Sequence, residues 1–307
     1  MLGHGCAADS LRVLGANDLA KELIASMHPR RWFKNIFMFA ALIFGLKLSM
    51  PGLIGRSLLA FACLCLLSSA SYLVNDLVDT ERDRFHPTKK DRPLAAGRLK
   101  RSWARTAAIG LASISLSVAF LVDWRFGLVA CAFLAVEFAY SFWLSNFVIL
   151  DVMAIAAAFI LRVMSGSVVA RASTFSPWLY VCGSFLALFL ALCKRRHELI
   201  VLGDLAPKHR QVLADYSSSL LLEMISVVTS STVIAYSLFT FWGAHVPANN
   251  SMMLTIPFVL YGILRYLLLM QRPDLPESPE EILIKDPPLI LNNLLWGTAV
   301  VAILYLF

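Results

Sequence analysis

Long, mostly apolar segments recur along almost the whole chain, and they constrain its folding more than any other feature. A helix of about 20 residues crosses the hydrocarbon core of a bilayer with its backbone hydrogen bonds satisfied internally. The segments are residues 32–49, 52–74, 104–122, 126–145, 147–170, 177–193, 220–243, 252–270 and 288–307. With 59% hydrophobic and 15% charged residues, the composition excludes an ordinary soluble enzyme. The sequence therefore predicts an all-α integral membrane protein with about nine transmembrane helices.

Polar stretches divide the chain into a short N-terminal part and one membrane domain. Residues 1–31 lack the charged start, apolar stretch and cleavage site of a signal peptide, so we expect a cytoplasmic N-terminal segment there. Residues 32–307 form the expected nine-helix transmembrane domain. Its cytoplasmic loops are predicted at residues 75–103, 194–219 and 271–287.

Positive charges are unevenly distributed between the two predicted sides of the membrane. With the N-terminus inside, most of the 27 Lys and Arg residues lie inside, and only Lys47, Arg125 and Arg171 lie outside. Because retained Lys and Arg mark the cytoplasmic side, we expect a multi-pass cell membrane protein whose N-terminus and large loops face the cytoplasm. The net charge of +7 then reflects orientation in a lipid bilayer, and nucleic acid is not an expected partner.

An acidic segment directly continues the second apolar helix. Four oxygen-bearing side chains fall within about 100° of helix surface. They are Asn75, Asp76, Asp79 and Asp83. A divalent cation relieves the repulsion between such carboxylates, and oxygen ligands favour Mg²⁺, which also binds substrate phosphates. Asn75, Asp79 and Asp83 are the predicted metal ligands. The alternative is an acidic helix end that forms ion pairs with Arg82 and Arg84.

Several cations follow these carboxylates in the loop at residues 86–98. Lys89, Lys90 and Arg92 place phosphate-binding groups beside the predicted metal ligands, since Arg offers bidentate contacts and Lys a mobile point charge. This combination favours a site for a phosphorylated substrate. The alternative is a loop that is basic only because it faces the cytoplasm and anionic lipid.

Other charged residues lie inside or at the ends of the apolar segments. Arg162 lies in the middle of a span, where a charge needs a partner; Glu137 is the expected partner, in a structural ion pair or in a phosphate site. Lys194 and Glu198 are four residues apart and share a helix face, so they form a salt bridge or belong to the site. Lys34 is a membrane-surface anchor or a substrate-binding residue.

Taken together, these motifs resemble the UbiA superfamily of intramembrane transferases, and more narrowly its decaprenyl-phosphate phosphoribosyltransferase branch. The matching motifs are Asn75-Asp76-x-x-Asp79-x-x-x-Asp83, His86-Pro87-Thr88-Lys89-x-x-Arg92-Pro93, Arg30-Arg31-Trp32-x-Lys34-Asn35, Leu161-Arg162-Val163-x-x-Gly166, Lys194-Arg195-Arg196-x-Glu198-Leu199, Gly262-x-x-Arg265-Tyr266 and Ser278-Pro279-x-Glu281-Ile282-Leu283. The resemblance implies nine helices around a central cavity that opens to the cytoplasm and laterally to lipid.

The resemblance also implies a reaction. It is the Mg²⁺-dependent transfer of 5-phosphoribosyl from phosphoribosyl diphosphate to a polyprenyl (decaprenyl) phosphate, with release of diphosphate, in the synthesis of cell-wall arabinan precursors. Asp79 and Asp83, assisted by Asn75 and Asp76, would hold the metal and act in catalysis. Substrate-binding residues would be Lys34, Lys89, Lys90, Arg92, Arg162, Lys194, Arg195 and Glu198. The oligomeric state is left open, with a homo-oligomer as one option.

Two alternatives stay open at this stage. A UbiA-type prenyltransferase would use the same acidic motif to ionise a prenyl diphosphate and alkylate an aromatic or other acceptor. Members of that kind carry a second Asp-rich motif after the sixth helix, where this chain has Lys194-Arg195-Arg196-His197-Glu198. A membrane transporter or lipid-binding protein is the alternative of another class, motivated by the polar groups inside the spans.

Overall fold

The computed structural model describes residues 16–85, 89–171, 177–271 and 281–306, and in those ranges the protein is helical with no strand. The elements are α1 Ala16–Ser26, η1 Pro29–Phe39, α2 Ala40–Phe44, α3 Pro51–Asp83, η2 Lys89–Asp91, α4 Arg101–Val122, α5 Trp124–Phe142, η3 Leu144–Asn146, α6 Leu150–Val169, α7 Pro177–Leu202, η4 Gly203–Leu205, α8 Ala206–His209, η5 Gln211–Ala214, α9 Ser218–Trp242, η6 Ser251–Thr255, α10 Ile256–Leu269, α11 Ile282–Lys285 and α12 Pro287–Leu306. The η elements are 3-10 helices.

Local sequence explains where several helices begin. Helices α3, α7 and α12 start at a proline, whose missing N–H is not needed in the first turn. Asp123 caps α5 by accepting a hydrogen bond from the Arg125 backbone N–H at 2.9 Å. Ser217 caps α9 through the Leu220 N–H at 3.1 Å. Side-chain oxygens thus satisfy N–H groups that lack a partner inside the helix.

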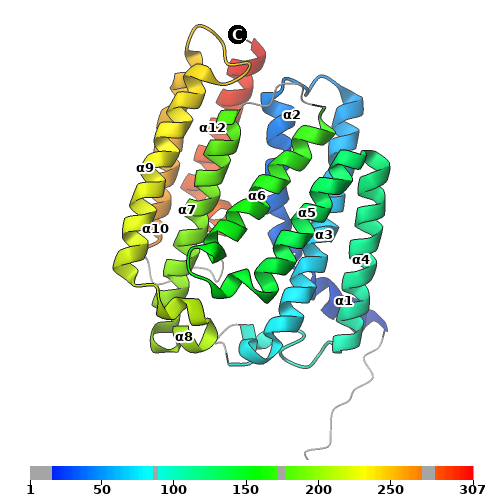
Figure 1. Ribbon diagram of the computed structural model, residues 1–307. Coiled ribbons are helices and arrows are strands. Elements are labelled where there is room, and N and C mark those ends of the chain that lie inside the picture. Colours follow the sequence, from blue (N-terminus) through cyan, green and yellow to red (C-terminus); the bar gives the residue numbers. More distant parts are fainter. Residues whose placement is uncertain (1–15, 86–88, 172–176, 272–280, 307) are drawn as a thin grey trace, which may run out of the picture.

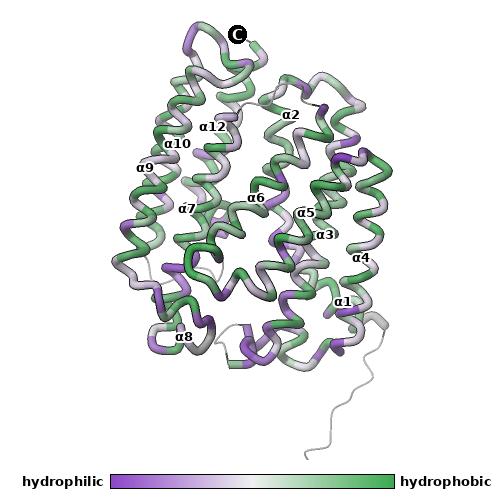
Figure 2. The backbone as a smooth tube through the Cα atoms, in the orientation of Figure 1, coloured by the Kyte–Doolittle hydropathy of each residue, from purple (hydrophilic) through white to green (hydrophobic). Residues whose placement is uncertain are grey.

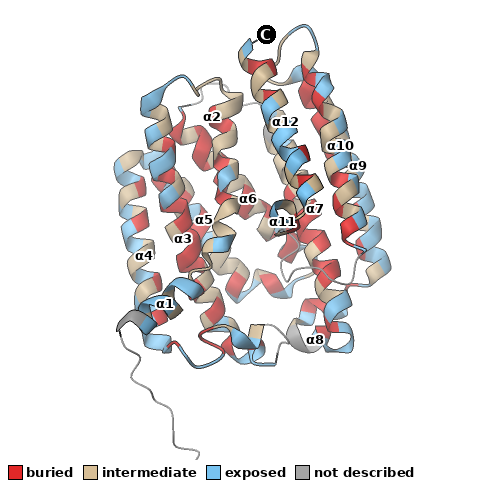
Figure 3. Cartoon of the chain, turned by 180° about the vertical axis from the view of Figure 1, so that it is seen from behind, coloured by how far each residue is buried: buried red, intermediate tan, exposed pale blue. Residues whose placement is uncertain are grey.

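The helices have the length and the surface of membrane spans, which confirms the predicted class. Within the described residues, seven helices are long and apolar enough to cross a bilayer: α3, α4, α5, α6, α9, η6 together with α10, and α12. These helices consist largely of hydrophobic residues (Figure 2) and have many exposed positions (Figure 3); among them Leu121 is 85% exposed, Leu254 71% and Val227 67%. Exposure of large aliphatic side chains on this scale fits a lipid environment. The 26-residue α7 occupies the position predicted for the sixth span.

The first predicted span differs most from expectation. Instead of one α-helix over 32–49, the chain forms η1 and then the short α2. A 3-10 helix rises about 2.0 Å per residue against 1.5 Å in an α-helix, so the pair extends about 30 Å, enough to cross the hydrocarbon core. The pair packs tightly on α6, since a Cβ on Gly166 would lie 1.8 Å from the Met38 carbonyl oxygen. Nine spans is therefore an approximate count.

Two of the predicted loops are partly helical. Helix α3 continues to Asp83, so the acidic segment belongs to the helix and the loop after it begins at Arg84. Helix α7 continues to Leu202 and is followed by the short elements η4, α8 and η5. The N-terminal residues 1–15 and most of the third predicted loop, 272–280, including the motif residues Ser278 and Pro279, lie outside the described residues.

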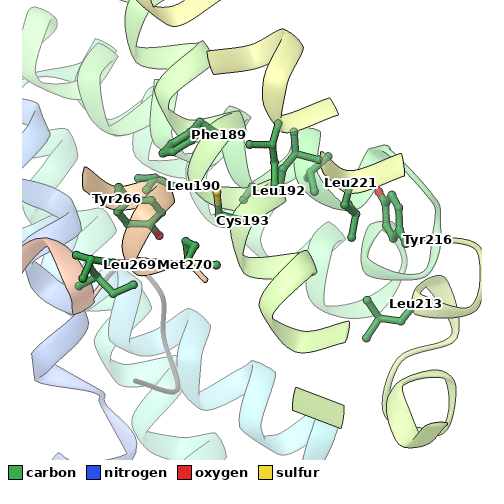
Figure 4. Close-up of a cluster of buried hydrophobic side chains, with 14 of the residues drawn as sticks. Phe189, Leu190, Leu192, Cys193, Leu213, Tyr216, Leu221, Tyr266, Leu269 and Met270 are labelled. Carbon is green, nitrogen blue, oxygen red and sulfur yellow. The ribbon is translucent and has the colours of Figure 1, made fainter. Parts of the chain in front are cut away.

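The two largest apolar cores of the described residues lie in different groups of helices. One core joins η1, α3, α4, α5 and α6 around residues such as Leu64 and Phe133. The other joins α7, α9, α10 and η5 (Figure 4), where Phe189, Tyr266 and Leu213 are buried. The groups meet where α6 packs along α7 (Figure 1). Helices α1 and α8 lie at one end of the bundle and the C-terminus at the other.

Candidate functional site

A polar cavity lies between the two helix groups. Its accessible interior is about 150 Å³, and it is partly open to solvent. Residues of η1, α3, α5, α6, α7 and α11 line it, together with the segments that follow α3 and α8. Apolar side chains such as Phe159 and Leu190 form part of its wall. The site therefore offers polar and apolar surface side by side inside the bundle.

Cations outnumber carboxylates on the described part of the cavity wall. The basic residues are Arg31, Lys34, Lys89, Arg92, Arg162, Lys194 and Arg210, and the acidic ones are Asp79, Glu137 and Glu198. A concave surface with such an excess of positive charge favours anionic ligands. Eight of the twelve residues given a metal, catalytic or substrate-binding role from the sequence contribute to this wall: Lys34, Asn75, Asp79, Lys89, Arg92, Arg162, Lys194 and Glu198.

The four acidic-motif residues of α3 do not all reach the cavity. Asn75 and Asp79 line it, and Asn75 Nδ2 donates to Ser141 Oγ on α5 at 3.4 Å. Asp76 and Asp83 are buried behind them. Arg92 Nη1 bridges these two carboxylates, at 2.9 Å from Asp76 Oδ1 and 2.8 Å from Asp83 Oδ2. Of the four residues predicted to share one helix face, two line the cavity and two form ion pairs with Arg92.

Ion pairing was the alternative interpretation of this helix end, and part of it is present. Arg82 lies 3.7 Å from Asp79 Oδ1, with about half of its side chain exposed. Arg84 pairs with Glu81 rather than with a motif residue, at 3.0 Å. Exposed pairs of this kind contribute little stability. They leave the cavity-facing side of Asn75 and Asp79 available to a ligand.

The oxygen-bearing side chains of the acidic motif are the candidate ligands for Mg²⁺. The described residues contain no group of three or more His, Cys, Asp or Glu that could hold a metal ion. Asn75, Asp79 and Asp83 supply only two carboxylates, and Mg²⁺ usually completes its shell with water and substrate phosphate. Asp83 Oδ1 is buried and accepts no hydrogen bond from the described residues. This orphaned oxygen and the oxygen-only donor set fit a magnesium site that forms together with a phosphorylated ligand.

The basic loop after α3 contributes two of its three predicted phosphate ligands to the cavity. Lys89 and Arg92 line the wall, whereas Lys90 is exposed and lies away from it. Burial lowers the pKa of the Lys89 ammonium, and Glu198 opposes that shift. The motif residues His86, Pro87 and Thr88 lie outside the described residues. Lys90 is therefore not a wall residue in this structure.

Arg162 and Glu137 form the intramembrane pair expected from the sequence. Their side chains lie 3.2 Å apart, and both line the cavity. Arg162 Nε also donates to Asn35 Oδ1 at 2.9 Å, and the guanidinium lies over the ring of Phe133. The ion pair that the sequence suggested is present, and it forms part of the cavity wall.

Two adjacent cations on helix α7, Lys194 and Arg195, have different surroundings. Lys194 and Glu198, one turn apart, line the cavity. Arg195 is fully buried and is not a wall residue, contrary to its predicted role as a phosphate ligand. Its Nε lies 2.6 Å from Asp151 Oδ2, and its other nitrogens contact Glu198 and Tyr140. One residue step rotates a helical side chain by 100°, which turns Arg195 toward the start of α6.

Several site residues were not predicted. Arg31 lines the cavity and lies over the ring of Tyr72, another wall residue. His28 Nε2 lies 3.1 Å from Asp76 Oδ2, behind the wall, where burial lowers the pKa of the imidazole. Arg210 reaches the cavity from the segment after α8. Residue spacing along single helices carries no signal for contacts between segments that are far apart in sequence.

The fold and the site define an all-helical membrane protein with a cation-rich cavity inside its bundle. Residues 35–282 match the UbiA prenyltransferase family, and the chain belongs to that family. The decaprenyl-phosphate phosphoribosyltransferase of Mycolicibacterium smegmatis is 32% identical over 303 residues, covering 94% of each chain. That of Corynebacterium glutamicum is 30% identical, covering 94% of this chain and 88% of its own.

A solved structure supports the same fold. The UbiA homologue from Archaeoglobus fulgidus bound to DMAPP and Mg²⁺ aligns with a TM-score of 0.72 at 17% sequence identity. The alignment covers 93% of this chain and the whole of the homologue. At this identity the likeness concerns the arrangement of the helices. It confirms the UbiA fold that the motifs implied.

Proposed function

We propose that this protein transfers a 5-phosphoribosyl group from phosphoribosyl diphosphate to decaprenyl phosphate or a similar polyprenyl phosphate and releases diphosphate. The observation that carries the proposal is the cavity wall, where cations surround Asn75 and Asp79 next to an apolar surface. Two relatives of about 30% identity or more that bear the name decaprenyl-phosphate phosphoribosyltransferase align along nearly the whole chain and support the choice of substrates.

The donor's diphosphate is assigned to the α3 end of the cavity. Asn75, Asp79 and Asp83 would hold Mg²⁺, which neutralises the charge that develops on diphosphate as it leaves. Lys89 and Arg92, from the loop after α3, supply cations to this part of the cavity wall. The two carboxylates that hold Arg92 fix its guanidinium in place, so little ordering is needed when a phosphate binds.

The acceptor needs no strong general base. A polyprenyl phosphate is already an anionic nucleophile, so its oxygen attacks the ribose carbon that carries the diphosphate, and the bond to diphosphate breaks. Lys34 and Arg162 are cations near the apolar wall that could bind the acceptor phosphate. Phe159 and Leu190 offer apolar surface for the start of the isoprenoid chain.

The proposed orientation places this chemistry at the cytoplasmic face of the cell membrane. The basic loop after α3 and the segment around α8 lie at the same end of the bundle as α1 (Figure 1). A water-soluble, highly charged donor is then able to reach the cavity from the cytoplasm, while the acceptor stays in the bilayer. The positive-inside distribution of Lys and Arg supports this orientation.

The experiment is a transfer assay with purified protein, Mg²⁺, labelled phosphoribosyl diphosphate and decaprenyl phosphate in detergent. Labelled lipid and an equal amount of diphosphate are expected. Absence of both would refute the proposal, and alkylation of an acceptor by a prenyl diphosphate would favour the prenyltransferase. A transporter would show flux across sealed vesicles and no transfer in detergent.

A further inference from the structure

The segment that joins α7 to α9 is held firmly against the bundle. Val212 and Leu213 of η5 are each 1% exposed and belong to the apolar core of the second helix group. The Tyr216 hydroxyl donates to Asp151 Oδ1 at 2.8 Å and accepts from the Ile149 backbone N–H. These contacts fasten the segment to the start of α6. They give Arg210, two residues before Val212, a fixed place beside the cavity.

Arg210 projects into the cavity in a defined orientation. Its Nη1 donates to Tyr140 Oη at 3.0 Å, and its guanidinium carbon lies 5.7 Å from the centre of the Tyr140 ring. The same phenol oxygen accepts from the buried Arg195 at 2.7 Å. The Tyr140 hydroxyl therefore links the buried Arg195 to Arg210 on the cavity wall.

The partners of Arg210 differ from those of the other wall arginines. Arg92 is held by two carboxylates and Arg162 by Glu137. Among the described residues, the side chain of Arg210 makes one hydrogen bond, to a neutral phenol, and no ion pair. A guanidinium has five N–H donors. Most of those donors, and a charge that no carboxylate contacts directly, therefore remain for an anion in the cavity.

The neighbours of Arg210 also favour an anion. Lys89 and Lys194 line the same cavity, and the charge of Arg210 acts on both Lys89 and Glu198. Planar, forked donors beside lysines are a common way to bind phosphate groups. We propose that Arg210, oriented by Tyr140, is a phosphate-binding residue of the cavity. Only the identity of the molecule that carries the phosphate rests on the proposed function.

The test measures ligand binding by full-length protein in detergent as protection against thermal unfolding. The probes, each with Mg²⁺, are diphosphate, ribose 5-phosphate and geranyl phosphate. Arg210→Gln removes the charge and the forked donors but keeps a polar side chain, and Arg210→Lys restores a charge without the fork. Arg105→Ala, at an exposed arginine of α4, is the matched control.

We expect Arg210→Gln to need at least ten times the wild-type concentration of one of the probes for half-maximal protection. Arg210→Lys should lie in between, and Arg105→Ala should match the wild type. A change with diphosphate or ribose 5-phosphate assigns Arg210 to the donor, and a change with geranyl phosphate assigns it to the acceptor. Unchanged protection by all three probes overturns the proposal.

The outcome separates this proposal from the proposed reaction. If the protein transfers no phosphoribosyl group but protection still depends on Arg210, the reaction is wrong and the phosphate-binding role stands. If Arg210 had a purely structural role, its substitution would lower the unfolding temperature in the absence of any probe. The probe concentrations for half-maximal protection would then stay unchanged. That result would also overturn the proposal. Tyr140→Phe should weaken the same probe as Arg210→Gln, because it removes the hydroxyl that orients the guanidinium.

Discussion

Lys194 and Arg195 are adjacent in the chain, yet they lie in different surroundings. Lys194 lines the cavity, whereas Arg195 is fully buried among Asp151, Glu198 and Tyr140. Removing a buried cation that pairs with two carboxylates is costly, because both carboxylates are then left without a compensating charge. Adjacent cations of α7 therefore contribute to different surroundings, Lys194 to the cavity wall and Arg195 to a buried ion-pair network.

Substitution by methionine at these two positions should have opposite effects. We expect Arg195→Met to lower stability by about 3–5 kcal/mol, the usual cost of leaving buried partners unpaired. Lys194→Met should change stability much less but raise the KM for the phosphorylated donor. Thermal unfolding and steady-state kinetics in detergent measure both effects. Equal loss of stability in the two variants would contradict the assigned places of the side chains.

Asp79 and Glu81 provide a second comparison at the residue scale. Asp79 lines the cavity, while Glu81 is exposed and pairs with Arg84 and Arg101. Asp79→Asn should reduce turnover roughly 100-fold or more, because it removes charge from the proposed magnesium site, with little change in unfolding temperature. Glu81→Gln should keep nearly full turnover. If Asp79→Asn retained wild-type activity across a magnesium titration, the metal assignment would be wrong.

At the scale of elements, the contact between η1 and α6 sets the position of much of the wall. The backbone of Met38 lies against Gly166, and Asn35 of η1 binds Arg162 of α6. Lys34 and Arg31 are carried on the same 3-10 helix. Glycine allows this close approach of two backbones, since any side chain there would collide with a carbonyl group.

Gly166→Ala should therefore push η1 away from α6. A Cβ would lie 1.8 Å from the Met38 oxygen, so we expect a loss of about 1–3 kcal/mol and reduced activity. Gly297→Ala in α12 is the control, because its Cβ would meet no atom within 4 Å. Thermal unfolding of both variants gives the comparison. Similar unfolding temperatures would show that the contact is looser than described.

The sequence predicted most helices because apolar length is a local property. The spans from α3 to α12 lie close to their expected ranges, and the acidic end of α3 is helical as inferred. The 3-10 form of η1 was not predicted, since apolar length does not report the pitch of a helix. Angular position on α3 likewise could not show that Arg92, from the following loop, would form ion pairs with the buried Asp76 and Asp83.

At the scale of the molecule, the cavity lies where the two helix groups meet, and residues of both groups line it. This division allows a water-soluble donor and a lipid acceptor to meet inside the bundle. In the proposed orientation, the end of the bundle with α1 and α8 faces the cytoplasm. The C-terminus lies at the opposite end of the bundle (Figure 1).

Orientation can be measured with a membrane-impermeant thiol reagent on vesicles of known sidedness. Asp91→Cys, in the exposed loop after α3, should react only when the cytoplasmic face is outward. Asn249→Cys, in the exposed segment before η6, should react only in the opposite orientation. The unsubstituted protein gives the background from its own cysteines. The reverse pattern would place the cavity mouth on the other side of the membrane.

The most direct test of the central claim offers the protein both classes of donor at once. Purified protein is incubated with Mg²⁺ and equal concentrations of phosphoribosyl diphosphate and a prenyl diphosphate. Decaprenyl phosphate and an aromatic compound are both present as acceptors. The products are identified and quantified by mass spectrometry. We expect phosphoribosylated decaprenyl phosphate, equimolar diphosphate, no prenylated acceptor, and almost no product with Asp79→Asn. A prenylated acceptor with the phosphoribosyl donor left intact would contradict the proposed function.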